Sequence, residues 1–134
     1  MPAGTASRRL YARRHAILAG MTDMFLHNSR CSKSRAALDL VRRAGIELPV
    51  REYLHEPLSV AELRRIVTML GVRPIEIVRR GEPQYKELGL SDATPDDEVL
   101  QAMAEHPILI ERPIVVCGGR AVVGRPPETV LEIL

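Results

Sequence analysis

The chain has 134 residues, 46% hydrophobic and 27% charged, which is the length and composition of one globular domain. A net charge of +2 is too small to indicate a nucleic-acid partner, and 3% aromatic residues are too few for a base-stacking surface. Two cysteines make no disulfide framework, and no apolar run approaches the roughly 20 residues of a membrane span. We therefore expect a cytoplasmic protein that binds neither membrane nor nucleic acid.

The first twenty residues have a composition of their own, with four arginines and no acidic residue. Organellar targeting peptides have a similar composition. The alternative is that Met21 is the true start and that residues 1–20 form a flexible N-terminal extension. We expect the second arrangement, with residues 21–134 as the folded domain.

A strand, a helix and a second strand are expected next. The apolar run TDMFLH, residues 22–27, predicts a buried strand, and LPVREYL, residues 48–54, alternates as a strand does. Between them a helix is expected from about Ser32 to a stop at Gly45. Its predicted apolar face consists of Ala36, Ala37, Leu40, Val41 and Ala44.

Helical segments follow in the middle of the chain. Ser59 and Glu62 have the spacing of a capping box, and Gly71 ends the helix that they begin. Residues 74–90 predict short helical turns, and Thr94 is expected to cap a further helix.

The last part of the chain predicts a hairpin and a helix. PIVVCGGRAVVG, residues 113–124, has two β-branched runs joined by two glycines, and PPETVLEIL, residues 126–134, predicts a helix. The whole order is strand–helix–strand, a helical block, then hairpin–helix. This layout predicts an α/β protein with a thioredoxin-like three-layer fold, in which a helical insertion separates the two halves of a mixed four-stranded sheet.

The stretch HNSRCSKSR, residues 27–35, carries the clearest chemical signal. It places Cys31 where the second predicted element begins, and a helix N-terminus stabilises a thiolate or a bound oxyanion. His27 and three basic neighbours are also expected to stabilise a thiolate at Cys31. The alternative for His27 is that it only forms a hydrogen bond to the backbone. The basic neighbours are Arg30, Lys33 and Arg35. We expect a nucleophilic thiolate next to an oxyanion site.

Spacing argues against several other cysteine chemistries. Ser34 stands where a Cys-x-x-Cys motif needs its second thiol, and Ala37 stands where a cysteine phosphatase needs arginine. The histidines and cysteines do not have zinc-finger spacing, so no metal is expected. A papain-like pairing of Cys31 with His106 has weak support, and Cys117 is expected to be a buried structural residue.

From about Met24 to Leu134 the chain resembles the glutaredoxin-dependent arsenate reductases of the ArsC type, within the thioredoxin-like superfamily. Five segments carry the resemblance, in the order and at the spacing of that family. They are HNSRCSKSR, YLHEP, IVRRGEPQYKELGL, HPILIERPIVV and GRPPETVLEIL.

The resemblance implies roles for individual residues. Cys31 matches the nucleophile, and His27 matches the histidine that helps to ionise it. Pro113 matches the cis-proline that thioredoxin-like domains place opposite the active cysteine. The residues assigned to substrate binding are Arg79 (with Arg80 as the fallback), Arg112, Arg125 and Ser34.

The implied reaction is the reduction of arsenate. Cys31 attacks arsenic(V), glutathione attacks the adduct, and glutaredoxin takes over the mixed disulfide as arsenite leaves. No bound cofactor is implied, because glutathione is an external reductant, and we expect a monomer.

Two alternatives from other classes are kept. Spx-type regulators share the fold and bind RNA polymerase, but they usually carry the second thiol that Ser34 replaces and lack the full arginine set. A general glutathione-dependent thiol oxidoreductase would use the same arginines for the carboxylates of glutathione.

Ser32 and Lys33 replace the glycine and threonine of the best-characterised reductases, and CSKSR is typical of a related ArsC-like branch.

Overall fold

The computed structural model describes residues 21–134, so the extension predicted for residues 1–20 lies outside the described residues. The described chain forms two compact units. The sheet unit contains residues 21–51 and 112–134, and the helical unit contains residues 52–111. Each unit is described by itself below.

Four short strands form one mixed sheet in the order β2-β1-β3-β4. Strands β1 and β3 pair antiparallel with Phe25 opposite Val115, and β3 and β4 form the predicted hairpin. Gly118 and Gly119 both have positive φ at its turn, a conformation that glycine adopts without steric cost. The strands are β1 (Met24–His27), β2 (Val50–Glu52), β3 (Ile114–Cys117) and β4 (Arg120–Val123). The expected sheet is therefore confirmed.

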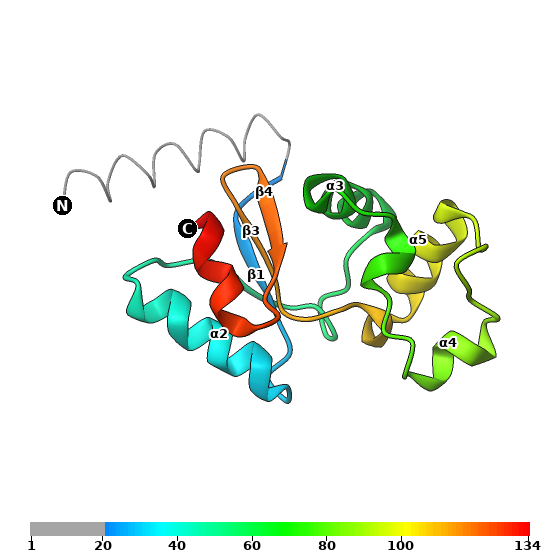
Figure 1. Cartoon of the computed structure of the whole chain (residues 1–134), viewed down its shortest axis with the longest axis horizontal. Helices are drawn as coiled ribbons and strands as arrows, with labels where there is room; N and C mark the ends of the chain where they lie inside the picture. The colour runs from blue at the N-terminus through cyan, green and yellow to red at the C-terminus, as the bar shows by residue number, and fades with distance from the viewer. Residues whose placement is uncertain (1–20) are drawn as a thin grey trace. The chain divides into compact units, whose positions relative to one another are not determined.

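Helix α2 (Ser32–Arg43) and the C-terminal 3-10 helix η3 (Pro127–Ile133) lie next to each other on one side of this sheet (Figure 1). They enclose an aliphatic core with a single aromatic ring, as the scarcity of aromatic residues requires. Its buried members are Phe25, Ala37, Leu38, Val41, Val115, Cys117 and Val130.

The apolar face predicted for α2 was partly wrong. Ala36 and Ala44 are exposed, whereas Ser34 and Leu38 are buried with Ala37 and Val41. Alanine occurs on both buried and exposed faces of helices, so the alanines did not show which face of α2 is buried. A serine counts as polar in such a pattern unless its hydroxyl finds a buried partner.

The helical unit consists of short helices, and its buried residues are aliphatic apart from the completely buried Tyr53. The capping box of Ser59 and Glu62 is present, and Gly71 ends α3 at φ +71°, as predicted. Within residues 21–134, no helix combines the length and apolar character that a membrane span requires. The elements are α3 (Val60–Leu70), η1 (Pro74–Ile77), α4 (Pro83–Glu87), α5 (Asp96–Glu105) and η2 (Pro107–Leu109).

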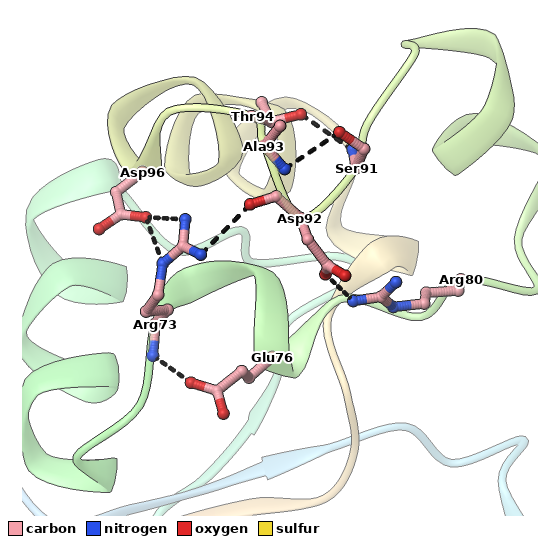
Figure 2. Close-up of polar contacts among 8 residues, drawn as sticks. All are labelled: Arg73, Glu76, Arg80, Ser91, Asp92, Ala93, Thr94 and Asp96. Carbon is pink, nitrogen blue, oxygen red and sulfur yellow. Dashed lines mark hydrogen bonds and ion pairs between the residues drawn. The ribbon is translucent and has the colours of Figure 1, made fainter.

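Thr94 does not cap α5, contrary to the prediction. Pro95 is the N-cap residue, and the Thr94 hydroxyl instead accepts a hydrogen bond of 2.9 Å from the backbone N–H of Ser91 (Figure 2). Short hydroxyl side chains bond nearby backbone in turns as readily as at helix starts. The threonine therefore closes the loop ahead of the helix.

Gly124 follows β4 at a position with no room for a side chain. Its N–H donates to the Pro113 carbonyl at 2.9 Å, and a Cβ there would lie 2.8 Å from side-chain atoms of both Pro113 and Val130. Gly124→Ala should therefore lower the free energy of unfolding by about 1–3 kcal/mol, measured by urea denaturation. Gly81→Ala is the matched control, because a Cβ at Gly81 meets nothing within 4 Å. Equal stability of the two variants would contradict this packing.

Candidate active site

Cys31 lies at the N-terminus of α2, as predicted. It is the N-cap residue, with φ −94° and ψ 121°, and its side chain makes no capping hydrogen bond. The thiol is free and partly exposed. The first turn of the helix contains no acidic residue. The sulfur therefore lies at the positive end of a helix dipole with no carboxylate of that turn to offset it.

Asn28 organises the loop that presents Cys31. Its backbone carbonyl accepts the N–H of Cys31 at 3.0 Å, and its side-chain Oδ1 accepts the N–H of Arg30 at 3.0 Å. The Asn28 side chain is only 7% exposed. Asparagine commonly forms such a turn by bonding the backbone two residues on. Asn28 was not among the predicted site residues, although the preference of asparagine for such turns could have indicated it.

His27 and Ser34 form a buried pair beneath the loop. Nδ1 of His27 lies 2.7 Å from Oγ of Ser34, and the same oxygen accepts the backbone N–H of Asn28 at 3.1 Å. Ser34 is completely buried, and the imidazole also packs against Phe25 with 5.6 Å between the ring centroids. These contacts fix the orientation of His27. The assignment of Ser34 to substrate binding stays a prediction, while its contacts with His27 and Asn28 are structural.

The surroundings of Cys31 in the chain are basic. Arg30, Lys33 and Arg35 are all exposed, and no acidic residue occurs between residues 24 and 38. Arg35 also donates from NH1 to the carbonyl of Ser29 at 2.8 Å, which ties its guanidinium to the loop. Exposed cations near a helix N-terminus increase the attraction for an anion.

Arg112 and Arg125, two of the three arginines predicted to bind an anion, belong to the sheet unit. Both are half-buried, and Nε of Arg125 donates to the Arg112 carbonyl at 3.0 Å. The Arg112–Pro113 peptide bond is cis, the conformation that the resemblance implies for Pro113. A hydrogen bond from the Arg125 side chain to the Arg112 backbone thus links the two residues.

Arg79 belongs to the helical unit and differs sharply from its fallback Arg80. Arg79 is 24% exposed, and its NH1 lies 3.0 Å from Oε1 of Glu82. Arg80 is 52% exposed and is paired with the carboxylate of Asp92 (Figure 2). Its guanidinium also lies over the ring of Tyr85. Both arginines are therefore paired with a carboxylate, and Arg79 is the less exposed of the two.

Cys117 is buried in β3, as predicted. Its Sγ lies 3.9 Å from Oδ2 of Asp23, and burial together with that carboxylate raises the pKa of Cys117 to about 11. The side chain therefore stays a neutral thiol near pH 7. Among residues 21–134, no three His, Cys, Asp or Glu side chains gather as metal ligands would.

The two thiols should differ in reactivity. With iodoacetamide at pH 7.5, native protein should be alkylated at Cys31 but not at Cys117, because Cys117 is buried and protonated. Peptide mass spectrometry before and after unfolding measures this, and Cys31→Ser should take up label only when unfolded. Equal labelling of both cysteines in native protein would contradict the assignment.

The Asn28 turn should control the Cys31 thiol. Asn28→Ala removes the acceptor of the Arg30 N–H and should cost about 1 kcal/mol of stability. Asn28→Asp keeps that acceptor but adds a negative charge to the Cys31 loop, so it should slow alkylation of Cys31 at neutral pH. The measurements are urea unfolding and the alkylation rate against pH. An unchanged rate in Asn28→Asp would show that the loop does not act on the sulfur.

A family model, curated relatives and solved structures each match most of this chain. The model of the ArsC family matches residues 26–133. The uncharacterised protein YfgD of Escherichia coli K12 is 49% identical over 110 residues, covering 81% of this chain and 92% of the relative. An arsenate reductase of Neisseria meningitidis serogroup A is 46% identical over 110 residues, covering 81% and 94%. The structure of an arsenate reductase from Vibrio cholerae is 50% identical with a TM-score of 0.80, covering 84% and 97%. This similarity confirms the expected thioredoxin-like fold.

Proposed function

This chain belongs to the ArsC family, and we propose from that premise that it reduces arsenate to arsenite through Cys31. The observation that carries the proposal is the partly exposed Cys31 thiol at the start of α2, in a segment whose only charged side chains are basic. Relatives that share 46% and 50% of their residues with this chain and carry the name arsenate reductase support the same substrate.

In the first step the Cys31 thiolate attacks arsenic(V). An arsenic–sulfur bond forms, and one arsenate oxygen leaves as hydroxide, which takes up a proton to become water. The guanidinium groups of Arg112 and Arg125, which belong to the same unit as Cys31, bind the remaining oxygens. The family resemblance assigns Arg79 to substrate binding as well. Arginine suits this role because its planar fork binds two oxygens at once and keeps its charge at any working pH. His27, whose Nδ1 lies 2.7 Å from Oγ of Ser34, is the histidine that the family resemblance assigns to the nucleophile.

The second step needs a thiol from outside the chain. Glutathione attacks the sulfur of Cys31, the electron pair of the arsenic–sulfur bond passes to arsenic, and arsenite leaves. The resulting disulfide between Cys31 and glutathione is reduced by glutaredoxin through thiol–disulfide exchange. An internal thiol cannot replace glutathione, because the only other cysteine, Cys117, is buried in β3.

A general glutathione-dependent oxidoreductase is the second candidate. The observation in its favour is that Arg30, Lys33 and Arg35 are exposed close to Cys31 in the chain. They add positive charge beyond that of the arginines assigned to the carboxylates of glutathione. Such an enzyme would reduce glutathione mixed disulfides without arsenate. A Spx-like regulator is less well supported, because a redox switch of that kind needs a second thiol that Ser34 does not supply.

A coupled assay tests the proposal. Purified protein should oxidise NADPH through glutathione reductase only when arsenate, glutathione and glutaredoxin are all present. Cys31→Ser should abolish this turnover, and Cys117→Ala should keep it, because Cys117 does not take part. Turnover by Cys31→Ser would overturn the nucleophile. Reduction of a small glutathione mixed disulfide together with no response to arsenate would favour the second candidate.

A further inference from the structure

We infer that the Ser34 hydroxyl donates its proton to Nδ1 of His27 and so fixes the imidazole as the neutral tautomer that carries its own proton on Nε2. Ser34 is then a positioning residue that acts through His27, and it is not a ligand of the substrate. The inference rests on the proposed function only in taking Cys31 as the nucleophile. All the residues that it uses belong to the sheet unit.

The hydrogen bonds of Ser34 leave its proton one acceptor. Oγ accepts the backbone N–H of Asn28 at 3.1 Å, so that contact uses a lone pair and not the hydroxyl proton. Oγ also lies 2.7 Å from Nδ1 of His27. Within residues 21–134 Oγ has no third hydrogen-bond partner, and Ser34 is completely buried from solvent. A buried hydroxyl needs an acceptor for its proton, and Nδ1 is the acceptor that is present.

The opposite tautomer would leave a buried proton without an acceptor. If Nδ1 carried a proton, it would donate to Oγ of Ser34, which already accepts from Asn28. The hydroxyl would then face two donors, and its own proton would be unpaired, which is costly in a buried place. The imidazolium has a proton on both ring nitrogens and meets the same difficulty. The bonds around Ser34 therefore favour one neutral form of the ring.

This tautomer limits what His27 can do for Cys31. Nδ1 is occupied by the hydroxyl proton of Ser34, and Nε2 already has a proton, so neither nitrogen can take the proton of the thiol. The ring can donate a hydrogen bond from Nε2, but it is neither a base for Cys31 nor a cation that attracts the thiolate. The thiol is partly exposed, so its proton passes to water, and the N-terminus of α2 stabilises the thiolate that remains.

The same bonds make Ser34 a poor ligand for an oxyanion. An oxyanion is bound by hydrogen-bond donors, and the single proton of Oγ is already committed to His27. The side chain is also completely buried. We therefore assign Ser34 to positioning the imidazole and the backbone of Asn28, and not to contact with the substrate.

NMR of the full chain, labelled with nitrogen-15 in its histidine rings, tests the inference. Couplings between the ring protons and the ring nitrogens show which nitrogen is protonated. The reduced protein is studied at pH 7.5, and His27→Gln identifies the His27 signals by their loss. We expect Nδ1 without a proton and Nε2 with one in the wild type. Cys31→Ser should show the same His27 pattern, because the ring does not hold the proton of the thiol.

Removal of the Ser34 hydroxyl should release the ring. In Ser34→Ala the preference for the Nε2–H tautomer should fall by at least about fivefold, which corresponds to the loss of a hydrogen bond of about 1 kcal/mol. A serine with a merely structural role would lower stability without changing the tautomer. The matched control is Ser32→Ala, which removes an exposed hydroxyl from the same helix and should keep the His27 pattern. If Ser34→Ala does not fold, the wild-type and Cys31→Ser spectra still decide the tautomer.

Three results would overturn the inference. They are a proton on Nδ1 of wild-type His27, an imidazolium in the wild type that becomes neutral in Cys31→Ser, and an unchanged tautomer in folded Ser34→Ala. The arsenate assay is separate from this test. Turnover of arsenate with a protonated Nδ1 removes only the role of Ser34, whereas the expected spectra without turnover keep that role and remove the reductase.

Discussion

The buried hydroxyl of Ser34 joins the end of β1 to the first turn of α2, and the candidate site depends on that junction. One oxygen contacts the imidazole of His27 and the backbone of Asn28, at 2.7 Å and 3.1 Å. Strand, loop and helix are thereby held in one arrangement, and Cys31 projects from it at the helix N-terminus. Because Ser34 is fully buried, its polar group is stabilising only while both contacts are kept.

The arginines assigned to anion binding are held in two different ways. In the sheet unit, Nε of Arg125 donates to the backbone carbonyl of Arg112, a neutral acceptor. In the helical unit, Arg79 faces the carboxylate of Glu82. A neutral acceptor orients a guanidinium, whereas a carboxylate also offsets its charge. The same residue type can therefore attract an anion strongly or weakly according to its neighbour.

Much of the fold followed from patterns close in sequence. The capping box at Ser59, the stop at Gly71 and the hairpin through Gly118 and Gly119 are local, and all three are present. The errors arose where a residue type permits two roles. Thr94 bonded a loop N–H where a helix cap was expected, and the alanines of α2 did not show which face was buried.

The candidate site was only partly predictable for a related reason. The position of Cys31 follows from where a strand ends and a helix begins, which the apolar pattern shows. The roles of the arginines and Pro113 came from the family resemblance, since a lone arginine in a sequence is usually a surface charge. The turn made by Asn28 and the pairing of Arg79 with Glu82 depend on side-chain geometry. Spacing alone does not indicate which acceptor a donor will meet.

The burial of Cys117 has a consequence for how the protein withstands oxidants. A sulfenic acid formed on Cys31 would have no neighbouring thiol in its own chain to trap it, because the second sulfur is enclosed in β3. Further oxidation to the sulfinic acid is irreversible for most proteins. Small thiols in solution must therefore react with the sulfenic acid of Cys31 before it is oxidised further. Reduction of an oxidised Cys31 thus requires a thiol from outside the chain.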